Sequence, residues 1–279
     1  MSSPFDLIFL DLDGTLVGKH DDVSPRNLAA LTAAQQRGIV IVICTGRNRY
    51  MVERVAEQWT GHGYGVFANG AVIEEWDTRR VIDKILLATS TMQKAARIAH
   101  AFGITPLCFG VHVDDDGGRT VYADARGTLV PEYGVRNAER LHFVDDLAAE
   151  TDIRPTSMGA YGTEAQTRAV ADAWRALHGA ELSVYHAVDK KYDCWCAFMN
   201  DRAANKANGA KTIAKALNIS QQRTLAIGDE LNDLELLNWA GIGVCMGGGH
   251  PDLLARADAI TGSCMEDGVA QAIERFVLG

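Results

Sequence analysis

The chain has 279 residues, of which 47% are hydrophobic, and a formal net charge of −9. This length is sufficient for two domains that each bury a core. The negative charge argues against binding to nucleic acid or to an anionic membrane, because no excess of Lys and Arg is present to neutralise phosphates. Residues 1–6 contain neither a basic segment nor a long apolar run, so we expect no signal peptide, no membrane span and a cytoplasmic protein.

The first predicted strand, in the segment 8–16 (IFLDLDGTL), ends in two carboxylates. Asp11 and Asp13 are two residues apart and therefore share a face of the strand, and Gly14 allows the chain to turn away. Two adjacent carboxylates repel each other unless a cation lies between them, which favours a hard divalent ion such as Mg²⁺. An isolated Asp-x-Asp is more often a solvent-exposed strand end, so the assignment depends on the remaining motifs.

A helix and a second strand follow. Ser24 and Pro25 predict the N-terminus of the helix, and Gly38 predicts its end. Residues 39–44 are nearly all β-branched, as expected of a strand that is buried on both faces. A right-handed strand–helix–strand crossover makes the two strands parallel, with both carboxyl ends at one edge of the sheet.

The segment after the second strand, Thr45-Gly46-Arg47, is therefore expected at the same edge as Asp11. A hydroxyl, a backbone N–H and a guanidinium at this position suit the oxygens of a phosphoryl group. Thr45 could also cap a helix that is predicted over residues 48–58. Residues 65–70 then predict a third strand and a turn.

The pattern changes after a hairpin predicted over residues 71–76 and 81–86. From about residue 89 to 198 the order helix, strand, strand occurs twice, in helices 91–102 and 164–178 and strands 106–113, 119–123, 181–187 and 192–199. We interpret this region as an α+β module with an antiparallel sheet, inserted into a parallel-sheet domain.

Three parts of the inserted module are harder to interpret. Residues 126–155 predict only a short helix near 145–150, and residues 156–161 predict a strand. The acidic run 114–118 is interpreted as a solvated hairpin turn and not as a calcium site, because no further ligand residues follow at loop spacing. Cys194 and Cys196 could hold a metal, but no second Cys or His pair follows at zinc spacing, so we interpret the scattered cysteines as reduced core residues.

The parallel pattern returns with a helix predicted over 206–217 and a strand over 223–227. The strand ends in the sequence GDELND, residues 228–233, which opens a helix over 234–240. Asp229 and Asp233 are four residues apart, so one can bind a metal while the other orients it or a neighbouring lysine. Strands at 242–246 and 259–260 and a helix over 267–277 complete the sheet.

Four segments in this order resemble the motifs of the haloacid dehalogenase superfamily: DLDGTLV from Asp11, TGR from Thr45, Lys206 at a helix start and GDELND from Gly228. The inserted module and Asn69-Gly70-Ala71 make the chain similar to the Cof-type branch, phosphatases of sugar phosphates and related small molecules. The resemblance covers essentially the whole chain. It implies an α/β fold with a Rossmann-like, parallel-sheet core (residues 1–85 and 199–279) and an inserted α+β cap domain (residues 86–198).

The resemblance also implies a mechanism. Asp11 would be the nucleophile that forms an aspartyl-phosphate, and Asp13 the general acid and base. Lys206, which alone among the lysines of its helix lies at the helix start, would contact the phosphoryl oxygens. The remaining implied roles are phosphate binding by Thr45, Gly46, Arg47 and Asn232, Mg²⁺ binding by the Asp11 carboxylate, the Asp13 carbonyl and Asp229, and support of this shell by Asp233.

Other functions remain open. A phosphomutase or phosphotransferase would use the same aspartyl-phosphate, and a receiver-like phospho-acceptor domain combines similar residues on a parallel sheet, although the inserted module argues against it. A dehalogenase is disfavoured, because halide displacement needs neither Asp13 nor Mg²⁺. Two departures from the Cof-type pattern are Gly247–Gly249, where an asparagine is usual, and Glu230, where a small or neutral residue is usual. The substrate and the oligomeric state do not follow from these residues, and Trp195, His186 and Tyr161 are specificity candidates by residue type alone.

Overall fold

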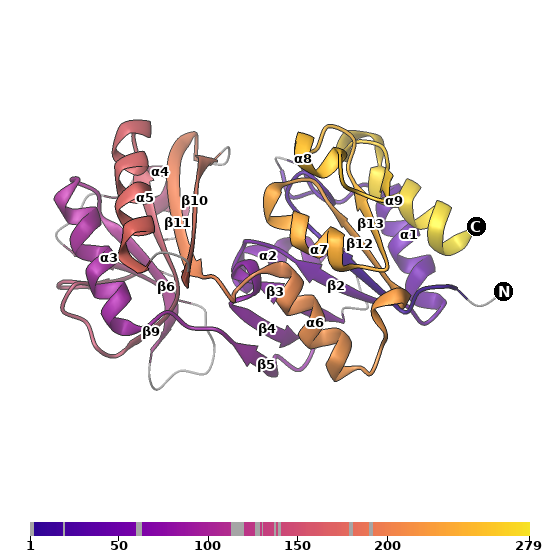
Figure 1. The fold of residues 1–279 in the computed structure, drawn as a ribbon, viewed down its shortest axis with the longest axis horizontal. Helices are drawn as coiled ribbons and strands as arrows, with labels where there is room; N and C mark the ends of the chain where they lie inside the picture. The colour runs from indigo at the N-terminus through magenta and orange to yellow at the C-terminus, as the bar shows by residue number, and fades with distance from the viewer. Residues whose placement is uncertain are drawn as a thin grey trace. The chain divides into compact units, whose positions relative to one another are not determined.

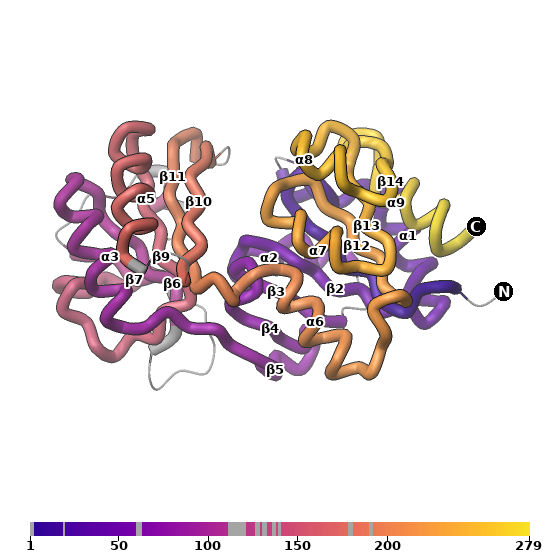
Figure 2. Tube along the Cα trace, viewed as in Figure 1, coloured from indigo at the N-terminus to yellow at the C-terminus, as the bar shows by residue number. Residues whose placement is uncertain are grey.

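The structure is a computed structural model that describes residues 3–279 except 19, 60–62, 113–119, 126–128, 130, 137, 139–140, 179–180 and 190–191. The chain divides into two compact units (Figures 1 and 2). The first contains Met1–Lys84 and Ala204–Gly279, and the second contains Ile85–Ala203. The second unit is therefore an insertion in the sequence of the first.

The first unit contains an eight-stranded sheet in the order β14-β13-β12-β1-β2-β3-β4-β5. The first six of these strands are parallel to one another, whereas β4 and β5 are antiparallel to their neighbours. The strands are β1 (Leu7–Leu10), β2 (Val40–Cys44), β3 (Tyr64–Phe67), β4 (Val72–Glu75), β5 (Val81–Lys84), β12 (Thr224–Gly228), β13 (Ile242–Cys245) and β14 (Ala259–Ile260).

Helices cover both faces of this sheet. On β1, Ile8 and Leu10 pack toward one core and Leu7 and Phe9 toward the other, because alternate side chains of a strand point to opposite faces. The first core contains residues of α1 (Pro25–Gln36), α2 (Arg49–Ala56) and α9 (Gly268–Ile273), and the second contains residues of α6 (Lys206–Ala216), α7 (Leu234–Trp239) and α8 (Pro251–Leu254). The mixed α/β fold with a parallel sheet that was predicted is confirmed.

The second unit contains a six-stranded sheet in the order β10-β11-β9-β6-β7-β8, antiparallel except for the β7–β8 pair. The strands are β6 (Pro106–His112), β7 (Thr120–Asp124), β8 (Leu141–Val144), β9 (Ile153–Gly162), β10 (Leu182–Asp189) and β11 (Cys194–Asp201). Helices α3 (Thr89–Ala101) and α5 (Glu164–His178) share one core with this sheet. Trp174 is fully buried in that core and donates its indole N–H to the Ala95 carbonyl at 3.1 Å.

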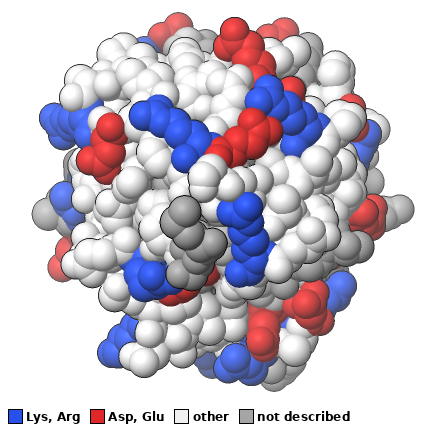
Figure 3. All heavy atoms as spheres, turned by 90° about the vertical axis from the view of Figure 1, so that its right-hand side faces the viewer, with Lys and Arg blue, Asp and Glu red and all other residues white. Residues whose placement is uncertain are grey.

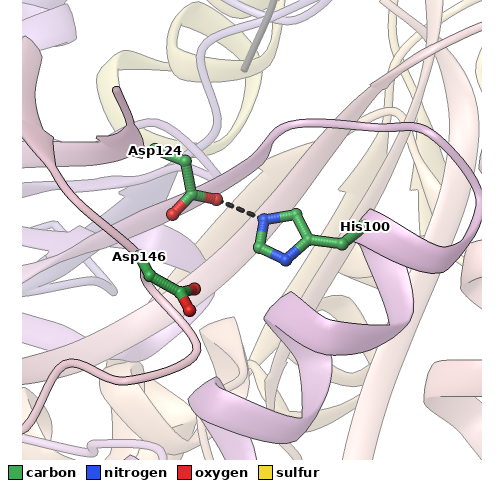
Figure 4. A group of neighbouring side chains, drawn as sticks. All are labelled: His100, Asp124 and Asp146. Atoms are coloured by element: carbon green, nitrogen blue, oxygen red, sulfur yellow. Dashed lines mark hydrogen bonds and ion pairs between the residues drawn. The ribbon is translucent and has the colours of Figure 1, made fainter. Parts of the chain in front are cut away.

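The short helix predicted near residues 145–150 is wrong, because this segment forms a turn. The Asp124 carboxylate accepts a hydrogen bond from the Leu147 backbone N–H at 2.5 Å, and the Asp146 carboxylate accepts one from Ala148 at 2.8 Å. Side-chain acceptors that bind local backbone N–H groups compete with helix formation. Figure 4 shows the ring nitrogen of His100 on the other oxygen of Asp124, so the contact links α3, β7 and the turn.

Helix α4 (Pro131–Arg136) and strand β8 were not predicted, because α4 has six residues with a glycine among them and offers no helical periodicity. The acidic run 114–118 lies outside the described residues. All six cysteines are free thiols.

The surface drawn in Figure 3 carries both signs of charge. Lys and Arg side chains alternate with Asp and Glu side chains there, and among the described residues of that face neither sign forms a continuous patch. Of the helices in the described part of the chain, none combines the length and the apolar character that crossing a membrane requires.

A buried ion pair in the first unit gives a test of the packing. Arg49 donates to Glu74 at 2.9 Å, and its guanidinium stacks on the Trp76 ring. The two charged side chains are only 6% and 4% exposed, so Glu74→Ala leaves a buried cation unpaired. We expect the free energy of unfolding, measured by urea denaturation, to fall by about 3–5 kcal/mol.

The control is the half-exposed pair Arg26–Glu274, whose side chains are 2.7 Å apart. Because solvent screens this pair, Glu274→Ala should lower the free energy of unfolding far less than Glu74→Ala does. Equal losses in the two variants would contradict the assignment of Arg49 and Glu74 as a buried pair.

Candidate active site

The polar residues of the candidate site follow three neighbouring strands. Asp11 comes directly after β1, Thr45 after β2 and Asp229 after β12. Strand β1 lies between β2 and β12 and is parallel to both, so the three carboxyl ends meet at one edge of the sheet. Open α/β sheets bind ligands at this edge.

Lys206 connects two of the carboxylates. Its ammonium donates to Asp11 Oδ1 at 2.6 Å and to Asp233 Oδ1 at 2.7 Å, and the side chain is 1% exposed. Lys206 is the first residue of α6, where the N-cap side chain of Asn205 accepts from the Asn208 backbone N–H at 2.8 Å. A lysine cannot satisfy free backbone N–H groups at a helix start, so its position there is explained by the two carboxylates that it contacts.

The carboxylates of the site outnumber the cations next to them. Ligand atoms of Asp11, Asp229 and Asp233 lie within 4.8 Å of one another. Burial raises the pKa of Asp11 well above its usual range; Lys206 opposes this shift, while Asp233 and Asp229 add to it. Burial, reinforced by Asp233, also raises the pKa of Asp229 to about 6. For Lys206, the two contacting carboxylates outweigh burial and raise its pKa.

The backbone around Asp229 holds its side chain and that of Asp233 in place. Thr15, in the turn after β1, donates its hydroxyl to Asp229 Oδ1 at 2.9 Å. The second oxygen of Asp233 accepts from the backbone N–H groups of Asp229 and Glu230 at 3.1 and 3.2 Å. Asp233 therefore orients both Lys206 and the loop that carries Asp229.

The two departures from the expected motif contribute to the same loop. The Glu230 side chain accepts from the backbone N–H of Asp233 and so caps a short 3₁₀ helix (Leu231–Asp233). His250 donates its backbone N–H to the Asp229 carbonyl at 2.7 Å, and a Cβ on Gly249 would come within 2.9 Å of that carbonyl oxygen. The glycine-rich loop therefore packs directly against the backbone of Asp229.

A turn after β3 contacts both the Thr45 segment and the Asp233 segment. Asn69 has a φ of 56°, donates its backbone N–H to the Thr45 carbonyl at 3.0 Å and accepts from the Asn232 side-chain amide at 3.0 Å. The next residue, Gly70, has a φ of 101°, and a Cβ there would lie 2.4 Å from the Asn205 carbonyl oxygen. The Oδ1 of Asn232 is buried and accepts no hydrogen bond within the described part of the chain, which leaves it open to a further donor or to a cation.

The Thr45 side chain does not cap α2, and that alternative is wrong. The N-cap residue of α2 is Asn48, while the Thr45 hydroxyl accepts from the Arg47 backbone N–H at 3.1 Å. This bond holds the turn after β2, and it leaves the hydroxyl hydrogen of Thr45 able to donate to a ligand.

Arg47 and Asp13 contact each other and lie apart from the Lys206 bridge. The Arg47 guanidinium donates to both oxygens of Asp13, with 2.8 Å from Nε to Oδ2, and to Asp21 at 2.6 Å. It also donates to the Met51 carbonyl at 3.2 Å. The roles predicted for Asp13 and Arg47 stay predictions, and the guanidinium donates to two carboxylates and a backbone carbonyl.

Three residues of this arrangement had no predicted role, namely Thr15, Asn69 and Asp21. Thr15 and Asn69 belong to quoted motifs, and Asn-Gly marks a turn, so a signal for their position was present in the sequence. Asp21 lies in a polar loop without a motif, and only the fold brings it to Arg47.

A family model for haloacid dehalogenase-like hydrolases matches residues 8–273. The chain belongs to this family. The predicted membership of the haloacid dehalogenase superfamily, in its Cof-type branch, is therefore confirmed, as is the prediction that the chain is an enzyme of this hydrolase class.

Relatives and solved structures match nearly the whole of this haloacid dehalogenase-like chain. It is 29% identical over 279 residues to the Bacillus subtilis putative phosphatase YxeH, covering 98% of this chain and 99% of the relative. It is 28% identical over 273 residues to the Bacillus subtilis 5-amino-6-(5-phospho-D-ribitylamino)uracil phosphatase YcsE, covering 98% and 96%. A haloacid dehalogenase-like hydrolase structure from Bacteroides thetaiotaomicron has a TM-score of 0.80 at 23% identity, covering 97% of this chain and 99% of that one, and shares its fold.

Two glycines with similar backbone conformations test the tight packing around Asp229. Gly14 has a φ of 82°, and a Cβ there would lie 2.2 Å from Asp229 Oδ2; Gly38 has a φ of 81° with open space around it. Gly38→Ala should cost about 1 kcal/mol for the left-handed backbone alone. Gly14→Ala should cost about 1–3 kcal/mol more, because Asp229 must also move. Urea denaturation measures both, and equal costs would contradict the close packing of Gly14 against Asp229.

Proposed function

We propose that this chain is a Mg²⁺-dependent phosphatase that hydrolyses a small phosphorylated metabolite, such as a sugar phosphate, through an aspartyl-phosphate on Asp11. The observation that carries the proposal is the buried Lys206 ammonium, which contacts Asp11 and Asp233 at the carboxyl edge of the parallel sheet. The family supports the reaction class, and the substrate in the name of the Bacillus subtilis relative YcsE supports a small phosphorylated metabolite.

The donor set and the charge balance fit Mg²⁺. When Asp11, Asp229 and Asp233 are ionised, the single Lys206 ammonium leaves two negative charges in excess, which matches one divalent cation. Carboxylate and carbonyl oxygens are the ligands that Mg²⁺ prefers. The residues that would hold it are Asp11, Asp229 and the main-chain carbonyl of Asp13. When bound, it would offset the repulsion between the Asp11 carboxylate and the phosphate dianion.

In the first half-reaction, a carboxylate oxygen of Asp11 attacks phosphorus and the bond from phosphorus to the ester oxygen breaks. Asp13 gives its proton to the departing alkoxide, which leaves as an alcohol. The product is an aspartyl-phosphate on Asp11 and an ionised Asp13. Lys206 already contacts Asp11 and is therefore close to the oxygens of the transferred group.

In the second half-reaction, Asp13 takes a proton from water, and the water oxygen attacks the phosphorus of the aspartyl-phosphate. The bond from phosphorus to Asp11 breaks, so inorganic phosphate and the free carboxylate are formed. Three groups near this position can donate hydrogen bonds to the phosphoryl oxygens, namely the Thr45 hydroxyl, the Gly46 backbone N–H and the Asn232 amide.

Further properties belong to the same proposal. A cytoplasmic location and the absence of nucleic-acid and membrane partners follow from the composition and stay predictions. A phosphomutase or phosphotransferase would use the same residues but pass the phosphoryl group from Asp11 to another acceptor, so it would show no sustained release of inorganic phosphate, which the activity measurement below distinguishes.

The proposal is tested by a phosphate-release screen over phosphorylated metabolites, with and without Mg²⁺. Asp11→Asn should lose at least about a thousandfold in kcat, because an amide does not replace the attacking carboxylate. Sustained turnover by this variant, or undiminished turnover by the parent enzyme after chelation of divalent ions, would overturn the proposed mechanism.

The raised pKa of Asp229 predicts that Mg²⁺ binding weakens in acid. With a pKa of about 6, the cation-free carboxyl is mainly ionised at pH 7 and mainly protonated at pH 5, and only the ionised form binds the ion. We expect the affinity for Mg²⁺ in titration calorimetry to fall at least about tenfold between these two pH values. Asp229→Asn should bind Mg²⁺ more weakly at both. An affinity independent of pH would contradict this role of Asp229.

A further inference from the structure

The Arg47 guanidinium has little capacity left for a phosphate. Within the described residues it makes four hydrogen bonds, two to Asp13 and one each to Asp21 and the Met51 carbonyl, which use four of the five N–H groups of a guanidinium. An arginine that recognises phosphate commonly presents a pair of parallel N–H groups to it. With one N–H remaining, Arg47 cannot do so while it keeps these contacts.

Asp13 depends on Arg47 for its orientation. The Asp13 side chain is 58% exposed, whereas that of Arg47 is 9% exposed. A buried guanidinium therefore holds an exposed carboxylate. The Asp13 backbone is fixed separately by its bridge to Val17. Each carboxylate oxygen can accept about two hydrogen bonds, so Asp13 keeps acceptor capacity for a substrate or a water.

Arg47 is in turn held from its far side by a loop with its own support. Asp21 has a φ of 61°, a left-handed backbone conformation that is strained for a residue other than glycine. Gln58 fixes this turn, because its amide donates to the Asp21 carbonyl at 2.6 Å and its oxygen accepts from the Val23 backbone N–H at 2.9 Å. The side chains thus form a chain of contacts that runs from Gln58 through Asp21 and Arg47 to Asp13.

From these contacts we infer that Arg47, braced by Asp21, is a positioning residue for the Asp13 carboxyl and not a phosphate ligand. The inference rests on the proposed function, in which Asp13 passes a proton to the leaving oxygen and takes one from water. Proton transfer requires the carboxyl within hydrogen-bond reach of the reacting oxygen, so an exposed side chain that is held in one orientation serves it better than a mobile one.

The dependence of the rate on the leaving group distinguishes a positioning role of Arg47 from a role in phosphate binding. An alkyl phosphate needs a proton on its departing oxygen, whereas p-nitrophenyl phosphate expels a stable phenolate with little help. In Arg47→Gln we expect kcat/KM, which reports the steps through departure of the leaving group, to fall about 100-fold with a sugar phosphate and only a few-fold with p-nitrophenyl phosphate. The inhibition constant of inorganic phosphate should change less than about threefold, because phosphate binding is retained.

Two further variants test the chain of contacts. Asp21→Asn should lower kcat/KM in the same substrate-dependent way by about tenfold, since the neutral amide holds Arg47 less firmly. With the sugar phosphate, Arg47→Lys should lose less activity than Arg47→Gln. An ammonium still binds Asp13 but does not offer the paired N–H groups of a guanidinium. The matched controls are Arg54→Gln and Asp22→Asn, which alter an exposed pair 3.8 Å apart, on helix α2 and on the loop that carries Asp21, and should leave both activities unchanged.

Equal losses of kcat/KM with both substrates, together with a tenfold or greater rise in the phosphate inhibition constant, would show that Arg47 binds phosphate and would overturn the inference. Parent-like kinetics in Asp21→Asn would also overturn it, and this variant decides the matter if Arg47→Gln does not fold. Parent-like Arg47 variants beside an inactive Asp11→Asn would remove the positioning role alone. A parent enzyme without Mg²⁺-dependent turnover would remove the proposed function and this inference with it.

Discussion

The Lys206 ammonium between Asp11 and Asp233 is the contact on which the site depends. It joins the end of β1, the start of α6 and the helix that follows β12, three elements far apart in sequence. All three charged side chains are buried. Removing one of them costs several kcal/mol, because the charges that remain lose their partner. Packing on both faces of the sheet therefore has to bring these three elements together before the site can form.

A second cation repeats this arrangement a short distance along the same sheet edge. Arg47 lies between Asp13 and Asp21 as Lys206 lies between Asp11 and Asp233, so the two acids of the first motif are neutralised by different partners. In the proposed reaction this division suits different tasks, since a compact ammonium contacts the Asp11 carboxylate that would attack phosphorus, while the planar guanidinium holds the exposed Asp13 carboxylate. Among the described residues no cation forms an ion pair with Asp229, and burial, reinforced by Asp233, raises its pKa.

Much of the first unit and its site could be predicted, because strong local patterns and short-range chemistry determine them. Three such signals determine the structure within a few residues of themselves. They are the β-branched run over residues 39–44, the helix start at Ser24-Pro25 and the acids that follow apolar strands. The second unit was harder, since the turn at 147–149 depends on Asp124, which the sequence places more than twenty residues away. The contacts of Arg47 were unpredictable for the same reason, as a guanidinium suits phosphate and carboxylate equally well and only the fold brings Asp21 to it.

The discontinuous first unit has a consequence for how the protein is made. A ribosome synthesises β1, β2 and β3 first, then the whole second unit, and only then β12, so one long edge of β1 stays unpaired during most of translation. Open strand edges invite pairing with other chains, and the nascent polypeptide therefore gains from chaperones that shield it. A prematurely terminated product carries Asp11 and Asp13 but lacks both Lys206 and Asp229. The cluster of Asp11, Lys206, Asp229 and Asp233 can therefore form only after the last part of the first unit has been synthesised.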